Sequence, residues 1–280
     1  MTRVSDFLKF AESCGLIIRR IEYDKWVRVP TTDKPKARNG AYKHLGNVAF
    51  VQNHATMPAT ATWFADKDSK IDAKAFAVRR RAASDLIRAD QERAAIKARH
   101  IVDNAILGPH PYLAKKGFGE MHGLVNGENL IIPMMINGKL CGCQIIAPDG
   151  GKKFLFGQRS GGAQFVLGAG NGTHWLAEGY ATALSLAACL NAIKAKYTIH
   201  ACFSAHNLTV IGKTLKNALV CCDNDKSNAG LNAAIATGHR FFMPERIGDD
   251  LNDQWVRDGS FKTSQAIRRF LVDVGASRVG

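Results

Sequence analysis

The chain has 280 residues, of which 46% are hydrophobic, enough to bury the core of one large domain or two modest ones. No stretch approaches the roughly 18 consecutive apolar residues of a membrane helix. The N-terminal MTRVSDFLKF also lacks the apolar part of an export signal, so we expect a cytoplasmic protein with no membrane partner. The net charge of +14 is uneven, since residues 1–100 hold 20 basic and 11 acidic side chains. A polyanionic partner suits this surplus, although many basic proteins bind no nucleic acid.

The seven cysteines lie mostly inside apolar runs, and none forms a C-x-x-C pair. This pattern predicts reduced, buried thiols in place of a disulfide framework. Cys141 and Cys143 could supply two zinc ligands, but no second Cys/His pair has finger-like spacing. We therefore expect no zinc.

The first part of the chain divides into two predicted segments. Residues 1–65 mix short apolar stretches with turn-rich, basic ones such as RVPTTDKPKARNGAY (Arg28–Tyr42), which indicates a basic β-rich module with a possible role in DNA binding. Residues 66–106 are predicted as a charged helical linker, because the stretch 71–106 has neither Pro nor Gly and is rich in Ala, Arg, Lys, Glu and Asp. A solvated connecting helix is favoured there over a dedicated nucleic-acid contact.

Residues 107–172 change to strand-like runs punctuated by glycine. Two β runs flank Asn137-Gly138, a strong hairpin signal, and a further turn follows at Asp149-Gly150-Gly151. We expect a small antiparallel sheet in an α+β subdomain. Residues 173–255 then repeat short apolar runs followed by polar turns and helical segments, which predicts an α/β domain with a parallel sheet flanked by helices. Residues 256–280 are expected to form a C-terminal helix or tail.

Carboxylates follow the predicted strands of the 173–255 domain. Glu178 follows the first strand, Asp223 and Asp225 follow the third, and Asp249 and Asp250 follow the fourth. Loops at the carboxyl ends of parallel strands converge, and Asp223 and Asp225 point the same way if the strand continues between them. Clustered carboxylates repel one another unless a cation neutralises them, and Mg²⁺ prefers such oxygens. The alternative for each acid is a helix N-cap, above all for Asp225.

Four segments of this domain resemble the TOPRIM domain of DnaG-type primases, topoisomerases, RecR-type proteins and some nucleases. They are EGYATALSL (Glu178–Leu186), CFSAHNL (Cys202–Leu208), the Asp-x-Asp pair and GDDLND (Gly248–Asp253). The first and last are especially similar to the versions in phage and plasmid primases, whose last motif reads Lys-Asp-Trp-Asn-Asp. In that motif Asp250 takes the acidic position, Leu251 replaces Trp, and Asn252 and Asp253 are retained. The resemblance implies Mg²⁺ or Mn²⁺ on Glu178, Asp223, Asp225 and Asp250, with support from Asn207, Asn252 and Asp253.

The segments before this domain resemble the N-terminal part of the DnaG-type catalytic core. HPYLAKKGF (His110–Phe118) is similar to that family's Tyr-Leu-x-x-Arg-Gly element, with Lys116 for Arg. The run NLIIPMMINGKLCGCQIIAPDGGKKFLFG (Asn129–Gly157) is similar to the block that follows. In such primases this part forms a basic ridge along the template, which implies phosphate contacts by Lys115, Lys116, Lys152, Lys153 and Arg159. Ordinary surface lysines are the alternative; Arg159, in a Gly-rich turn, is favoured most.

The chain departs from the family at its N-terminus, where DnaG-type primases usually carry a Cys/His zinc ribbon and this chain has only Cys14. The module of residues 1–65 would have to replace it. Basic residues interleaved with aromatics suit single-stranded DNA. The residues in question are Arg28, Lys34, Lys36, Arg38 and Lys43 around Trp26 and Tyr42. A plain folded β module with core aromatics remains the alternative.

The resemblance implies a DNA primase that joins ribonucleoside triphosphates into short RNA primers on single-stranded DNA. No P-loop of the G-x-x-x-x-G-K-[ST] form is present, so we expect any helicase to be a separate chain, in the host bacterial cytoplasm if a phage or plasmid encodes the protein. A TOPRIM nuclease and a non-catalytic DNA-binding mediator are the other readings of the same acids. The role of Glu178, as metal ligand or as base for the 3′ hydroxyl, stays open.

Overall fold

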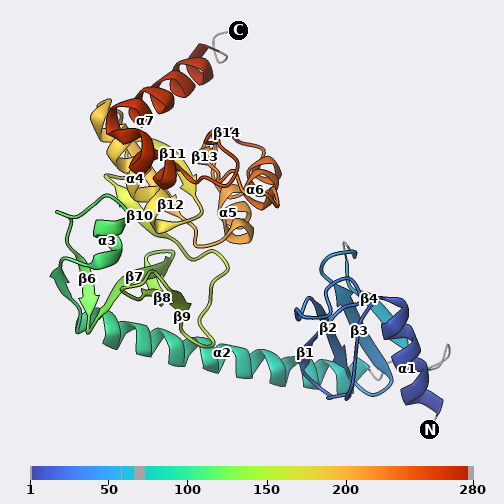
Figure 1. Cartoon of the computed structure of the whole chain (residues 1–280). Coiled ribbons are helices and arrows are strands. Elements are labelled where there is room, and N and C mark those ends of the chain that lie inside the picture. Colours follow the sequence, from blue (N-terminus) through green and yellow to red (C-terminus); the bar gives the residue numbers. More distant parts are fainter. Residues whose placement is uncertain (1, 58, 66–72, 277–280) are drawn as a thin grey trace. The chain divides into compact units, whose positions relative to one another are not determined.

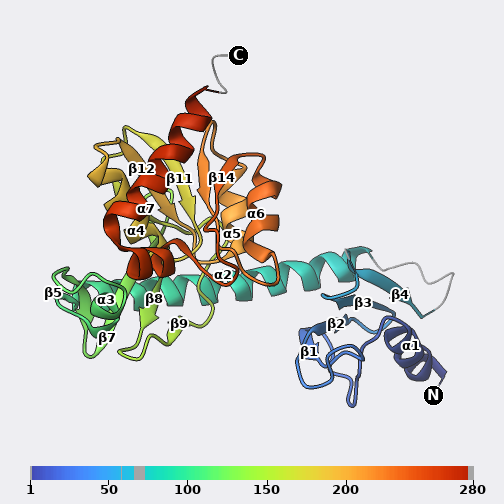
Figure 2. The same cartoon turned by 45° about the horizontal axis from the view of Figure 1, so that its top comes forward.

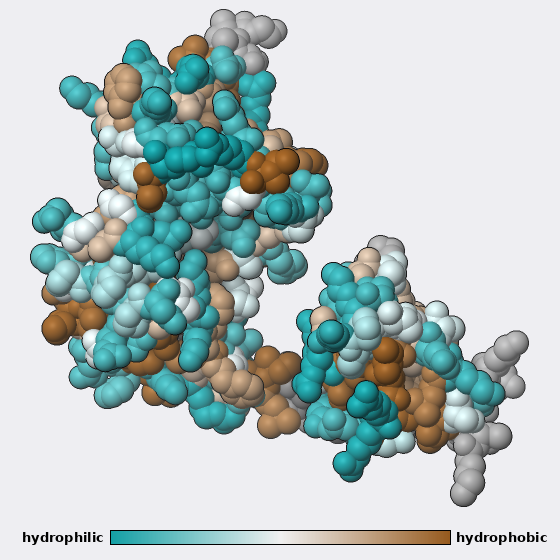
Figure 3. All heavy atoms as spheres, viewed as in Figure 1, coloured by the Kyte–Doolittle hydropathy of each residue, from teal (hydrophilic) through white to brown (hydrophobic). Residues whose placement is uncertain are grey.

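The structure is a computed structural model that describes residues 2–57, 59–65 and 73–276. Within these residues the protein is mixed α/β with three sheets (Figure 1). It divides into two compact units, Met1–Ser84 and Asp85–Gly280. On the face shown in Figure 3, hydrophilic residues cover most of the surface of both units, and hydrophobic side chains gather in separate patches.

The first unit is a four-stranded antiparallel sheet covered on one face by a helix. Helix α1 (Thr2–Ser13) precedes strands β1 (Trp26–Val29), β2 (Gly40–His44), β3 (Val48–Asn53) and β4 (Ala61–Phe64), which pair in that order. Alternate residues of the strands bury against α1, around Phe7, Val51 and Trp63. The β-rich module predicted for residues 1–65 is therefore present, with a helix that the sequence did not suggest.

Tyr42 belongs to this core, so the prediction that it is available to stack on bases is wrong. Its side chain is fully buried on β2, on the face that packs against α1. The hydroxyl accepts a hydrogen bond from the backbone N–H of Glu22 (2.8 Å) and donates one to the carbonyl of Arg20 (3.1 Å). A central strand buries every second side chain, and here the aromatic falls on the buried side. Tyr42 is thus one of the core aromatics of a folded β module.

The stretch predicted as a charged helical linker forms a single helix, α2 (Ala73–Asp103). Residues 66–72 of the predicted linker lie outside the residues that the structure describes. Helix α2 is more than a solvated connection, because Ala94 and Ala98 are buried against Ile131 and Cys143 of the second sheet. These alanines are four residues apart, so they lie on one face of the helix.

The second sheet is antiparallel, as predicted. Its strands are β5 (Ile106–Gly108), β6 (Gly123–Asn126), β7 (Asn129–Ile136), β8 (Lys139–Ile146) and β9 (Lys152–Phe154), in sequential order, with helix α3 (Pro111–Lys115) between β5 and β6. The predicted hairpin at Asn137-Gly138 joins β7 to β8, and both residues have the positive φ that such a turn requires (49° and 74°). The turn at Asp149–Gly151 joins β8 to β9 and is also confirmed.

The third sheet contains the predicted parallel strands. β11 (Thr173–Ala177), β12 (Tyr197–Ala201), β13 (Leu219–Cys221) and β14 (Arg240–Phe242) run parallel, in the order β12-β11-β13-β14. Strand β10 (Phe165–Gly168) adds an antiparallel edge next to β12. The expected division at residue 172 therefore separates β10 from the sheet to which it belongs. The sequence could not show this, because a short strand before a glycine-rich stretch does not reveal which strand it pairs with.

Helices cover both faces of the third sheet. Helix α4 (Tyr180–Ala192) and helix α7 (Leu251–Ala276) pack on one face, around Trp175, Leu186 and Ile267. Helix α5 (Ala205–Gly212) and helix α6 (Ala229–Thr237) pack on the other face, around Leu208 and Val220. Figure 2 shows the sheet between these two helical layers.

The C-terminal segment is part of this core and begins earlier than expected. Helix α7 starts at Leu251, five residues before the predicted boundary at 256, and its chain kinks at Gly259 (φ 81°). Ile267 and Val274 are buried against the sheet. Among the residues that the structure describes, no helix has the length and apolar character needed to cross a membrane.

We predict that Phe7→Ala destabilises the first unit by about 3–5 kcal/mol, because Phe7 is fully buried among Tyr42 and Trp63 and its removal leaves a cavity. Val4→Ala on the same helix is the control, since Val4 is 44% exposed. Hydrogen exchange of the β2 and β3 amides in the full chain measures the loss. Equal exchange in the two variants would contradict this account of the core.

Candidate active site

Two of the predicted acids lie at the point in the third sheet where the order of the strands changes direction. Glu178 directly follows β11 and Asp223 lies two residues after β13, and these strands are parallel neighbours with Ala177 opposite Cys221. The chain passes from β11 to β12 on one side and then to β13 on the other. Ligands of open α/β sheets bind in the crevice at such a reversal. The sheet thus positions Glu178 and Asp223 where a ligand is expected.

Asp223 is the most perturbed acid of the group. Its Oδ1 atom is buried and has no hydrogen-bond partner in the described part of the chain. Burial first, and then the negative charges of Asp250, Glu178 and Asp225 in that order, raise the pKa of this carboxyl to about 7. An ionised carboxylate in this position keeps one buried oxygen without a hydrogen bond, which is the condition that a bound cation would relieve.

Asp225 makes the hydrogen bonds of a local turn. Its carboxylate accepts the backbone N–H groups of Ser227 (2.8 Å), Ala229 (3.2 Å) and Gly230 (2.9 Å), and the hydroxyl of Ser227. These bonds, that of Gly230 first, lower the pKa of Asp225 to about 2. The capping alternative therefore accounts for the contacts of Asp225, and a shared metal with Asp223 stays a prediction.

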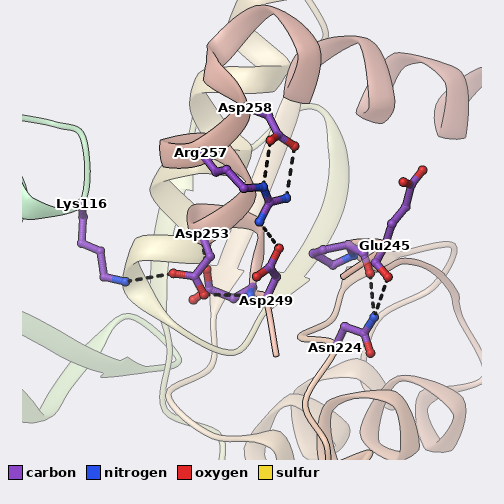
Figure 4. Close-up of polar contacts among 9 residues, drawn as sticks. Lys116, Asn224, Glu245, Asp249, Asp253, Arg257 and Asp258 are labelled. Carbon is purple, nitrogen blue, oxygen red and sulfur yellow. Dashed lines mark hydrogen bonds and ion pairs between the residues drawn. The ribbon is translucent and has the colours of Figure 1, made fainter. Parts of the chain in front are cut away.

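Gly230 and Asn224 hold the chain around Asp223. A Cβ atom at Gly230 would lie 2.6 Å from the carbonyl oxygen of Asp223, so only glycine fits there. Asn224 exchanges backbone bonds with the segment before α7, donating its N–H to Asp249 (2.9 Å) and accepting that of Gly248 (2.6 Å). Its side-chain amide donates to the carbonyl of Pro244 (2.9 Å) and, at 3.4 Å, to that of Glu245 (Figure 4). This pairing brings Asp250 close to Asp223.

The two adjacent acids before α7 have different partners. Asp249 forms an ion pair with Arg257, which also contacts Asp258 (2.8 Å), and these carboxylates raise the pKa of Arg257 (Figure 4). Asp250 caps α7 instead, since its Oδ1 accepts the N–H of Asp253 (2.8 Å). Its Oδ2 accepts the hydroxyl of Thr182 on α4 (3.3 Å). Of the two, Asp250 is the acid whose charge acts on Asp223, and its role as a metal ligand stays a prediction.

Lys116 and Lys152 bring positive charge to these acids from the second sheet and its helix. The Lys116 ammonium lies 3.8 Å from Asp253 Oδ1 (Figure 4). The amide of Asn252 donates to the Lys116 carbonyl (2.8 Å) and to the hydroxyl of Ser185 (3.0 Å), which ties α7 to both segments. Loss of contact with water lowers the pKa of Lys152, and so does the positive charge of Lys116. The negative charges of Asp250 and Asp223 raise it. Both lysines were predicted as phosphate contacts.

Tyr112 and Thr182 belong to the group, and the sequence did not single them out. Lys152 Nζ lies 5.8 Å from the centre of the Tyr112 ring, a cation–π distance. The Tyr112 hydroxyl is buried without a hydrogen-bond partner in the described residues, and its burial, with the charge of Asp250, raises its pKa to about 12. The position of Tyr112 inside the HPYLAKKGF element was the available signal.

The other predicted residues are exposed or bind parts of the chain other than these acids. Lys115, Lys153 and Arg159 are exposed, and the backbone carbonyl of Arg159 accepts a weak bond from the Cys141 thiol (3.4 Å). Asn207 is buried and structural, since its amide donates to the carbonyls of Ala163 (2.6 Å) and Cys202 (2.7 Å). In the first unit the exposed members of the predicted basic set are Arg28, Lys34, Lys36 and Arg38.

The acidic residues are of the right chemical type to bind a divalent cation, but their side chains are not arranged around a common point. Across residues 2–57, 59–65 and 73–276, no group of three or more His, Cys, Asp or Glu side chains is placed so that it could hold a metal ion. Asp223 nevertheless has a buried, unpartnered carboxylate oxygen, and burial and the charge of Asp225 raise the pKa of Glu178. Carboxylates in this state are suitable ligands for Mg²⁺ or Mn²⁺.

No protein-family model matches the chain, and neither does any curated protein or solved structure. The resemblance to TOPRIM primases therefore depends on the sequence motifs alone.

We predict that Asp223→Asn stabilises the metal-free protein at alkaline pH. The folded-state pKa of Asp223 is raised from 3.8 to about 7, so the stability of its protonated form is fully present below pH 3.8 and is lost as the pH rises through about 7. The gain in the variant should reach about 2–4 kcal/mol at pH 8.5 and be small at pH 4.

Hydrogen exchange of the β11 and β13 amides, in a buffer whose chelator removes metal ions, measures this gain at pH 4 and at pH 8.5. Asp103→Asn is the control, because the Asp103 side chain is 57% exposed at the end of α2. A gain for Asp223→Asn that does not change between pH 4 and pH 8.5 would show that the raised pKa is not real.

Proposed function

We propose that the second unit is a TOPRIM-type catalytic core and that the protein is a DNA primase. The observation that carries this proposal is the buried, unpartnered Asp223 carboxylate among Glu178 and Asp250, at the reversal of a parallel sheet, with Lys116 and Lys152 beside it. Acids on one side and lysines on the other suit a ligand that carries both a metal ion and phosphates. The motifs that resemble phage and plasmid primases favour primer synthesis among the reactions of such a site.

The residues of the chain would divide the work of nucleotidyl transfer. Asp223, Glu178 and Asp250 would hold the Mg²⁺ or Mn²⁺, which when bound supplies Lewis-acid stabilisation of the triphosphate. Lys152 and Lys116 would bind the phosphates and neutralise charge as the leaving group departs. Glu178 has a raised pKa, so it is also suited to accept the proton of the attacking 3′ hydroxyl.

The face of the first sheet that points away from α1 supports a role in binding the template. Residues directly opposite one another on paired strands share a face. Trp26, Lys43, Phe50 and Thr62 therefore form one row across the four strands, on the side away from α1. Trp26 is 52% exposed and the basic Arg28 lies two residues further on the same strand. Rings beside cations suit single-stranded nucleic acid, whose bases stack while its phosphates pair.

The proposal includes the remaining partners that the sequence implied. The substrates would be ribonucleoside triphosphates and a single-stranded DNA template, in the cytoplasm, with a replicative helicase on a separate chain. The acids alone would serve a nuclease equally well, so the decisive experiment must distinguish synthesis from cleavage.

We predict that Asp223→Asn lowers primer synthesis by more than about 100-fold, because it removes a ligand charge from the metal site. The assay incubates the full chain with mixed-sequence single-stranded DNA, labelled ribonucleotides and Mg²⁺ or Mn²⁺, and resolves short products on a denaturing gel. Asp103→Asn should retain activity. If the wild-type protein degrades the template, the proposed function is wrong and the protein is a nuclease. If the Asp223→Asn variant still makes primers, the proposed metal site is wrong.

We predict that Trp26→Ala weakens binding to a single-stranded oligonucleotide by about 1–3 kcal/mol through the loss of one stacked base. Lys43→Ala should reduce the salt dependence of binding by about 0.7 in log–log slope, the value for one phosphate contact on a single strand. Lys9→Ala, an exposed lysine on α1, is the control on the other side of the sheet. Fluorescence anisotropy at several salt concentrations measures both effects. Unchanged affinity in Trp26→Ala would remove the first unit from template binding.

A further inference from the structure

A cavity of about 310 Å³ lies beside the acidic site, in the second unit. Its wall is formed by Phe154, Leu155 and Ser160 after β8, by Met134 of β7, and by Phe203 and Ser204 between β12 and α5. The volume is at the lower end of the range of small-molecule sites, which is about 300–1,000 Å³. It therefore suits one small ring system.

The lining of this cavity is aromatic and rigid. The Phe154 and Phe203 rings are perpendicular, with centroids 6.3 Å apart, and Phe154 is 47% exposed. Gln158, which also lines the cavity, accepts the N–H groups of Cys143 and Leu155 (both 3.1 Å) and donates to the Met134 sulfur (3.0 Å). Because these bonds hold the wall in place, a flat ligand would find preformed faces on which to stack.

Polar groups in the cavity are few and lie at its edge. Asn207 uses its side-chain amide to bind the loop before β10, accepting the Gly162 N–H at 2.7 Å. Ser204 accepts the N–H of Asn207 (3.2 Å), which leaves its hydroxyl proton for another acceptor. Ser160 is exposed. One or two hydroxyls beside aromatic walls match the heteroatom edge of a nucleobase.

The cavity shares both of its walls with the acidic site. The Phe203 N–H donates to the carbonyl of Glu178 (2.7 Å), and Phe203 is held at a positive φ of 68°, so its position depends on Glu178. The Ala205 N–H, two residues later, donates a hydrogen bond to the Glu178 carboxyl. On the other wall, Phe154 lies two residues after Lys152 on β9, and alternate residues of a strand share a face.

We propose that this cavity binds the nucleobase of a ribonucleoside triphosphate whose phosphates reach Lys152 and the acids. The base stacks on the face of one of the two rings, Phe154 or Phe203, and contacts the other at its edge, while the hydroxyls of Ser204 and Ser160 meet its polar edge. The placement of the phosphates rests on the proposed function, whereas the base site rests on the cavity itself. Because every base can stack on a ring, stacking gives affinity without strong discrimination among the bases.

The test is equilibrium binding of a ribonucleoside triphosphate labelled on its ribose, with Mg²⁺, to the full chain. We expect Phe154→Ala and Phe203→Leu to weaken binding by about 5–150-fold, the equivalent of losing one base–ring contact. Phe156→Ala is the matched control, because Phe156 is 91% exposed and lies two residues from Phe154 without lining the cavity. It should bind as tightly as the wild type.

Competition by inorganic triphosphate with Mg²⁺ separates the base from the phosphates. We expect its affinity to be the same in Phe154→Ala and in the wild type. An equal loss for inorganic triphosphate and nucleotide, or nucleotide binding unaffected by either substitution, overturns the base site. Wild-type protein that binds single-stranded DNA but no mononucleotide overturns it as well.

Primer synthesis distinguishes this inference from the proposed function. If primers are made and Phe154→Ala has an unchanged KM for nucleotides, the base site is wrong and the primase stands. If no primers are made but nucleotide binding depends on Phe154, the base site stands and the primase is wrong. A raised KM with little change in kcat supports both.

Discussion

The buried negative charge at Asp223 is the constraint on which the second unit depends. Burial and the neighbouring carboxylates raise its pKa to about 7, so ionising this side chain in the folded chain costs free energy. A sequence selected for stability alone would place an apolar or amide side chain there. Several features keep the carboxylate where it is, including the Gly230 contact and the Asn224 pairing with the loop before α7. A carboxylate held in an unfavourable environment in a sheet crevice is typical of a functional site.

The second sheet is needed for this site as much as the parallel sheet. Lys152 comes from its last strand and Lys116 follows α3, while the acids follow β11, β13 and the loop before α7. Tyr180 of α4 packs with Tyr112 and Leu130, so the two sheets share one apolar cluster. Because opposite charges come from opposite sides of this cluster, the site exists only where both sheets are folded and packed together. Residues far apart in the chain, such as Lys116 and Asn252, then fix the register between them.

The parts of this arrangement that follow from local patterns could be predicted from the sequence, and those that depend on packing could not. Asn137-Gly138 specifies a hairpin by its own backbone preferences, and apolar runs followed by Glu178 or Asp223 mark strand ends. Tyr42 was misplaced because composition does not show which face of a strand α1 covers. Asp225 could be a ligand or a cap, and only the positions of Ser227 and Gly230 reveal its cap bonds. Tyr112 was overlooked because its ring meets Lys152 only across folded sheets.

Glu178 connects the charged and the aromatic parts of the site. Its carboxyl belongs to the acids and receives the Ala205 N–H, while its carbonyl receives the N–H of Phe203. One residue thus holds the start of α5, one ring of the cavity and one carboxylate of the acidic group. Because the same short segment holds Phe203 and the Glu178 carboxyl, a base bound in the proposed cavity and a cation bound by the proposed acids would both contact groups that this segment positions.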